Sequence, residues 1–308
     1  GDVYKRQDPG LGYYMRGKLW MVVKDIDKAI SDFDEYIKVN PGLEYGYFLR
    51  GRAFQEKGDL DKAISDFSEA IKKKVDYVDA YIQRGILLSN KKELDKAISD
   101  FSEVIKLNPR STTGYFYRAM ILRSRDPDKA IADFTEVIKM NPNFVSAYGN
   151  RAEMWFVKKE FDRALEDINV AIKFTPHNPY PFLLRGMIWD RKKEYLKAIA
   201  DFNEAIRVAP EFPDAYEKLA VLWATCSDAS IRNGQKAVVS AKKACELTEW
   251  KNPLYIAILA AAYAEAGDFQ QAVKWQVKAL EMAPAEYKNG FKYQLDLYKS
   301  NKPYHEKN

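Results

Sequence analysis

The chain has 308 residues, of which 47% are hydrophobic and 14% aromatic, so it has ample material for a buried core and is not globally disordered. Its 49 basic and 44 acidic residues give a formal net charge of +5, a balance that does not favour nucleic acid as the partner. The two cysteines, Cys226 and Cys245, exclude a disulfide framework, and the longest apolar run, Ile256 to Ala264, is too short to span a membrane.

The N-terminal segment resembles an artefact rather than natural sequence. Residues 2–7, Asp-Val-Tyr-Lys-Arg-Gln, look like the in-frame translation of a transposon end used in making sequencing libraries, so we exclude residues 1–7 from the fold. On this interpretation the natural protein continues upstream, with room for a signal peptide or a whole domain before residue 8. The sequence therefore predicts a soluble chain, cytoplasmic or exported, and no particular compartment.

From residue 10 to residue 284 the sequence repeats one pattern. An alanine followed by an aliphatic residue recurs at steps of 34, 34, 33, 34 and 34 residues, at Ala29, Ala63, Ala97, Ala130, Ala164 and Ala198. A second small residue precedes each of these alanines by eleven or twelve positions, and two further units contain Ala220 with Ala237 and Ala260 with Ala272. The pattern predicts eight units, which start near residues 10, 44, 78, 112, 145, 179, 213 and 253.

Each unit has the apolar spacing of two helices. In the first half of the second unit, Tyr47 lies four positions before the small residue Gly51 and Phe54 lies three after it, which places all three on one helical face. In the second half, Phe67 follows Ala63 by four positions. Prolines at most junctions between units predict the points where one helix ends before the next begins.

The C-terminal segment predicts a cap. Tyr287, Phe291, Leu295 and Tyr298 form one apolar stripe, so residues 285–300 are expected to form a helix that covers the last unit. Residues 301–308 are expected to be a tail, frayed at Lys302-Pro303-Tyr304. The seventh unit carries five extra residues within Cys226 to Gln235, at a turn between helices.

This arrangement of small, aromatic and proline positions resembles the tetratricopeptide repeat family over residues 10–284. The resemblance implies an all-α fold, a right-handed α-solenoid of helix-turn-helix repeats that ends in a capping helix. The last two repeats and the cap look like a C-terminal module of environmental bacterial repeat proteins, some of which carry an upstream kinase or other signalling domain.

Two charged positions vary together from repeat to repeat. An arginine precedes the small residue of the first helix in the first six repeats, an aspartate precedes the apolar residue of the second helix in the same six, and both are lost in the last two. This covariation predicts structural ion pairs within a repeat rather than an anion-binding ladder. The expected pairs are Arg16 with Asp32, Arg50 with Asp66, Arg84 with Asp100, Arg118 with Asp133, Arg151 with Asp167 and Arg185 with Asp201.

No pattern typical of an active site occurs. The only histidines are His177, at a proline-rich junction, and His305, in the tail; no GxxxxGK[ST] loop or HExxH motif is present. The carboxylates recur with the repeat instead of converging at one place. We therefore expect no catalysis, no cofactor and no metal site. Doubled lysines at 91–92, 158–159 and 192–193 are interpreted as a solvated rim rather than a site for RNA or an acidic partner.

The resemblance also implies where a partner binds. In the family, the inner surface formed by the first helices holds extended peptides through positions three before, one after and four after the small residue. Here these positions supply the candidate residues Tyr14, Lys18, Met21, Phe48, Arg52, Gln55, Ile82, Ile86, Phe116, Met120, Arg123, Phe156, Leu183 and Met187, with Ser89, Gly149, Glu153 and Asp190 at the remaining ones. The alternative for each side chain is packing between neighbouring helices.

These candidates are apolar and aromatic with scattered charge, and they lack the lysine and asparagine set with which chaperone adaptors of the family clamp a C-terminal carboxylate. The sequence thus predicts a non-catalytic scaffold that binds an extended apolar or aromatic peptide in a concave groove. One alternative is a regulatory or docking arm of a longer signalling enzyme, for example a kinase, and another is a structural assembly scaffold. The expected partner is a protein or peptide, with no expectation for the oligomeric state.

Overall fold

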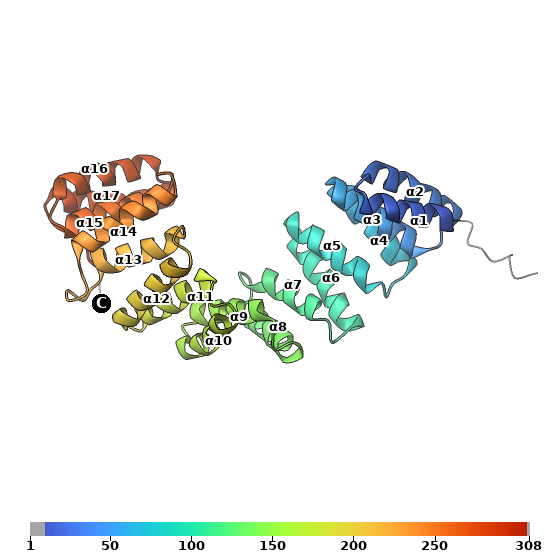
Figure 1. Cartoon of the computed structure of the whole chain (residues 1–308), viewed down its shortest axis with the longest axis horizontal. Coiled ribbons are helices and arrows are strands. Elements are labelled where there is room, and N and C mark those ends of the chain that lie inside the picture. Colours follow the sequence, from blue (N-terminus) through green and yellow to red (C-terminus); the bar gives the residue numbers. More distant parts are fainter. Residues whose placement is uncertain (1–9, 307–308) are drawn as a thin grey trace, which may run out of the picture. The chain divides into compact units, whose positions relative to one another are not determined.

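The structure, a computed structural model, describes residues 10–306; the expectation for residues 1–7 lies outside this part of the chain. Between residues 10 and 306 it contains seventeen α-helices and no strand (Figure 1). The helices are α1 (Leu11–Val22), α2 (Ile26–Val39), α3 (Glu44–Lys57), α4 (Leu60–Lys73), α5 (Val78–Asn90), α6 (Leu94–Leu107), α7 (Thr112–Leu122), α8 (Pro127–Met140), α9 (Val145–Val157), α10 (Phe161–Phe174), α11 (Pro179–Arg191), α12 (Tyr195–Val208), α13 (Pro213–Thr225), α14 (Gly234–Leu247), α15 (Pro253–Glu265), α16 (Phe269–Met282) and α17 (Ala285–Lys299).

The helices group into two compact units, one that reaches to Met154 and one that starts at Trp155. Within each unit the most extensive contacts join the two helices of a pair, as between α3 and α4 or between α11 and α12. Successive pairs pack in chain order, as α4 packs on α5 and α12 on α13, and α17 packs on α16. The expected all-α repeat fold is therefore confirmed.

A small residue on the first helix of a pair lets an aromatic ring of the second helix approach the backbone. A Cβ atom at Gly51 would lie 2.9 Å from a ring carbon of Phe67, and one at Gly186 would lie 2.5 Å from a ring carbon of Phe202. Both rings are buried, with 0% and 1% of their surface exposed. Because real carbon contacts are longer than this, a larger residue at either glycine would force the helices apart.

In six repeats the turn between paired helices contains a left-handed backbone residue. Gly58 (φ 85°) and Gly267 (φ 83°) occupy this position in two repeats, and Lys92 (φ 64°) and Lys193 (φ 61°) occupy it in others. Where an aspartate follows, its side chain caps the second helix, as Asp59 does by accepting a hydrogen bond from the Lys62 backbone N–H. The second lysine of a doubled pair thus has a structural place in the turn.

Replacement of Lys92 by glycine is expected to raise the free energy of unfolding by about 0.5–1 kcal/mol, since glycine adopts positive φ without the clash of a Cβ atom. The neighbouring Lys91, with φ of −77°, is the matched control, and glycine there should lower stability instead. Urea denaturation of both variants measures the difference. Equal effects at the two positions would contradict the role of the left-handed turn.

Candidate peptide-binding site

In five repeats the arginine of the first helix binds the aspartate of the second helix of the same repeat. Its Nε and Nη2 atoms donate to the two carboxylate oxygens, a bidentate arrangement, and each of these aspartates is buried. The Nη2 to Oδ1 distances are 2.6 Å for Arg16–Asp32, 2.7 Å for Arg50–Asp66, 2.7 Å for Arg84–Asp100, 2.8 Å for Arg118–Asp133 and 2.7 Å for Arg185–Asp201. Arg151 and Asp167, the sixth expected pair, belong to different units.

The arginines of the second to sixth repeats also reach the preceding repeat, a set of contacts that the sequence pattern did not predict. The Nη1 atom donates to a side-chain oxygen sixteen residues earlier: Arg50 to Asp34, Arg84 to Ser68, Arg118 to Ser102, Arg151 to Thr135 and Arg185 to Asn169. The acceptor always stands two positions after the aspartate of its own repeat, and this regular polar position is the signal that was overlooked. Donors used in this way are not available to hold an anion.

Near the N-terminal end of the first unit, Tyr14 and Lys18 interact with each other. The Lys18 Nζ atom donates to the Tyr14 hydroxyl at 3.2 Å, and this hydrogen bond lowers the pKa of Tyr14. The ring of Tyr14 lies 5.6 Å from that of Tyr45. Met21 packs against the buried cluster that contains Phe33. Of these three candidates, only Lys18 is an exposed residue.

Phe48 and Phe116 are half-buried in clusters of aromatic rings. The ring of Phe48 lies 5.6 Å from that of Phe67 and 5.0 Å from that of Tyr77. Phe116 is placed in the same way, 5.9 Å from Phe134 and 4.9 Å from Phe144. These two side chains fill space between successive helices, so they offer a ligand only part of their surface.

The other candidates of the first unit are also largely engaged. Ile86 packs against a buried cluster, and Arg52, Gln55 and Ile82 are half-buried. The Arg123 Nη1 atom donates to the Asn150 side chain at 2.7 Å, and its Nη2 atom pairs with Glu153. Met120, at 38% exposure, presents the largest apolar surface among these candidates.

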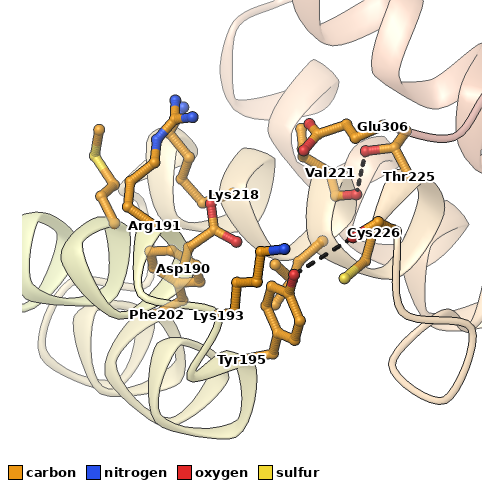
Figure 2. A pocket seen from close by; sticks show the side chains of 13 residues that line it. Asp190, Arg191, Lys193, Tyr195, Phe202, Lys218, Val221, Thr225, Cys226 and Glu306 are labelled. Carbon is orange, nitrogen blue, oxygen red and sulfur yellow. Dashed lines mark hydrogen bonds between the residues drawn. The ribbon is translucent and has the colours of Figure 1, made fainter. Parts of the chain in front are cut away.

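In the second unit the candidates Leu183 and Met187 pack against the cluster of Phe202, and the ring of Phe156 lies 6.0 Å from that of Phe161. Beside Met187 lies an open pocket of about 170 Å³, which we call the α11–α13 pocket (Figure 2). Its lining includes Met187, Asp190, Tyr195, Lys218, Val221 and Thr225.

The α11–α13 pocket contains charges of both signs. Burial raises the pKa of the Asp190 carboxyl, and the positive charges of Arg191 and Lys218 offset this only in part. Between residues 10 and 306, no hydrogen bond of the Asp190 side chain is found. Glu306 reaches the same pocket, and burial raises the pKa of its carboxyl as well. The pocket therefore holds two carboxyl groups whose burial raises their pKa and favours the protonated form.

Two segments that break the repeat pattern meet near this pocket. In the insertion after α13, Arg232 donates through Nη1 to the carbonyl of Cys226 at 2.7 Å and through Nε to Glu265 at 3.0 Å. In the tail, His305 Nε2 lies 2.6 Å from the other Glu265 oxygen, and the Glu306 backbone N–H donates to the Thr225 carbonyl at 2.8 Å. Up to residue 306 the tail therefore has partners on α13 and α15, contacts that the expectation of fraying did not include.

In the part of the chain that the structure describes, other kinds of site have little to support them. Across residues 10–306, no group of three or more His, Cys, Asp or Glu side chains is placed to hold a metal ion. None of the seventeen helices has the length and apolar character needed to cross a membrane. Cys226 and Cys245 are both buried free thiols.

Comparison with known proteins places the chain in a family. Models of the tetratricopeptide repeat match residues 48–112, 121–179 and 255–286, which together make up just over half of the chain. A search of curated proteins found no match.

Solved structures similar to the chain show the same fold at low identity. One is YrrB, described as a TPR protein with an unusual peptide-binding site, at 17% identity over 60% of this chain and 96% of that one, with a TM-score of 0.56. A second, a repeat protein of Parabacteroides merdae, has 14% identity over 94% of this chain and 98% of that one, with a TM-score of 0.56. A third, the APC/C hetero-tetramer Cut9–Hcn1, has 12% identity over 96% of this chain and 57% of that one, with a TM-score of 0.61. From the repeat period, the helix pairs and the matching family models together, the chain belongs to the tetratricopeptide repeat family.

Proposed function

We propose that this protein is a non-catalytic interaction scaffold and that the first helices of its second unit bind an extended segment of another protein. The observation that carries the proposal is the α11–α13 pocket, an open space beside the first helices of two successive repeats. Its walls combine the apolar side chains of Met187 and Val221 with polar groups such as Asp190 and Thr225. A mixed lining of this kind suits a peptide, which has apolar side chains and a polar backbone.

The candidates Met187 and Asp190 belong to this pocket, while the first unit supplies a second, weaker set. In that set Met120 and Lys18 are exposed residues, whereas Phe48 and Phe116 are largely engaged with other rings. We therefore place the main peptide anchor in the second unit. A docking arm of a longer enzyme would use the same surface, so one pair of variants tests the site for both functions, whereas an assembly scaffold without a discrete peptide ligand would show no peptide binding in this pocket.

Peptides selected from a random display library on the full chain are expected to carry an aromatic or aliphatic anchor. Their binding should show a negative heat-capacity change and weak dependence on salt, because burial of apolar surface drives it. Replacement of Val221 by arginine should weaken the binding at least about tenfold, since the long charged side chain fills the pocket and loses hydration there. Isothermal titration calorimetry measures all three quantities.

The matched control is Val239→Arg, at a residue of α14 with 70% exposure. It makes the same chemical change outside the pocket and should leave peptide binding unchanged. If a folded Val221→Arg variant binds as well as the native chain, the pocket is not the site. Steep weakening by salt would instead favour the lysine-rich turns and an acidic or nucleic-acid partner.

A further inference from the structure

The repeat pattern is broken most clearly in two places, and the structure brings them together. One is the insertion that follows α13 and contains Arg232, and the other is the non-helical tail after α17. Each contacts the same side chain, Glu265 at the end of α15. Contacts that recur in every repeat maintain the stack, whereas this contact occurs once. It therefore calls for an explanation specific to this place in the chain.

The tail crosses the C-terminal ends of two first helices in turn. The Lys302 N–H donates to the Leu297 carbonyl at the end of α17. Tyr304 then packs against the core of the last repeats. His305 then meets Glu265 on α15, and the Glu306 N–H meets the Thr225 carbonyl on α13. The chain thus runs back toward α11 and reaches the edge of the α11–α13 pocket.

Two hydrogen-bond acceptors lie along the path of the tail, which we call the tail track (Glu265 and the Thr225 carbonyl). Glu265 has only 16% of its side chain exposed, and Arg232 fixes its Oε1 atom, which leaves Oε2 directed at the tail. The Thr225 carbonyl is at the end of α13, where helical carbonyls lack partners within the helix. Together they recognise a donor side chain and the backbone N–H of the residue after it.

We propose that residues 304–306 are an internal ligand, which competes with an extended partner peptide carrying an aromatic residue followed directly by a hydrogen-bond-donating side chain. This inference rests on the proposed function, because the partner is taken to bind along the tail track into the α11–α13 pocket. A tethered tail has an effective concentration on the order of 1 mM, so it excludes a free peptide of equal affinity at micromolar concentration. Release of the tail opens the site.

The test uses the full chain and a labelled peptide with the tail's own sequence, Lys-Pro-Tyr-His-Glu-Lys-Asn. The triple variant Tyr304→Ser, His305→Ala, Glu306→Pro removes the aromatic ring, the side-chain donor and the backbone N–H that hold the tail, so it frees the place of each for the peptide. Fluorescence anisotropy should show binding to this variant at least about tenfold tighter than to the native chain. Adding Glu265→Gln should weaken the binding again, because the amide is a poorer acceptor than the carboxylate.

Lys299→Ser, an exposed change in the last turn of α17, is the control and should leave the site closed. Hydrogen exchange gives a second readout: the Glu306 amide of the native chain should exchange slowly, and the Tyr304→Ser variant should expose it. Failure of the released variant to bind the peptide, or fast exchange of Glu306 in the native chain, overturns the proposal. The two hypotheses can fail separately. If Val221→Arg weakens the binding of library peptides but these peptides bind the native and released chains with equal affinity, the proposed function stands and this inference alone is refuted.

Discussion

Replacement of Asp100 by alanine is expected to lower the free energy of unfolding by about 3 kcal/mol, because it leaves the half-buried guanidinium of Arg84 without its bidentate partner. Asp100 has 4% of its surface exposed, and its hydrogen bond is the main reason why the pKa of Arg84 lies above its ordinary value. The second contact of Arg84, to Ser68, is a neutral hydrogen bond and compensates little of the loss. Chemical denaturation measures the change.

The control for Asp100 is Asp95→Ala on the same helix. Asp95 pairs with Arg125 at the surface, where 89% of its side chain is exposed, and such pairs contribute less than about 1 kcal/mol. A small effect is therefore expected there. Equal losses in the free energy of unfolding for the two variants would show that a buried Arg–Asp pair stabilises the fold no more than an exposed one. The structural role of the buried pairs would then be wrong.

Replacement of Phe202 by alanine is expected to cost about 3–5 kcal/mol, because it leaves a cavity at the closest approach of α11 and α12. The ring is 1% exposed and packs with Leu219 and Leu222 of the next repeat as well as against Gly186. The loss therefore affects two helix pairs together. Hydrogen exchange of the backbone amides should show faster opening of α11 to α13 than of the first unit.

Leu196→Ala provides the comparison for Phe202. It also truncates an apolar residue of α12, but Leu196 has 74% of its surface exposed and has little burial to lose. Its stability should stay within about 0.5 kcal/mol of the native value. Faster opening of the first unit in Phe202→Ala, equal to that of the second, would show that the stacked pairs unfold as one and that the nearest-neighbour view fails.

The fold was predictable from the sequence because its signals are local and repeated. The spacing of Tyr47, Gly51 and Phe54 identifies a helix by itself, and seven similar units support the same assignment. The second set of arginine contacts was missed for a different reason. Its acceptors are Asp, Ser, Thr or Asn, so no single residue type occupies that position throughout, and only the shared ability to accept a hydrogen bond links them.

The candidate site was predictable only where it follows the repeat. Met187 and Asp190 stand at positions that the family resemblance singles out, but Thr225 and Glu306 do not. The tail has no second copy in the sequence against which a pattern could be read, and its contacts depend on where α17 ends. The rings of Phe48 and Phe116 pack against Tyr77 and Phe144. These two residues directly precede the first helix of the next repeat, so helical spacing does not identify them.

The two contacts of each arginine also bear on how such an array changes its length. Both partners lie at nearly fixed offsets along the chain, fifteen or sixteen residues after the arginine and sixteen before it. After duplication or deletion of one whole unit, every arginine beyond the first unit therefore still finds an acceptor in the unit before it, because any unit can donate to any predecessor. The series stops where Leu219 replaces the arginine, although Asn203 still stands at the acceptor position before it. Units up to the sixth are in this sense interchangeable parts, whereas the last two, which hold the insertion and the tail, can be neither copied nor lost without dismantling their own contacts.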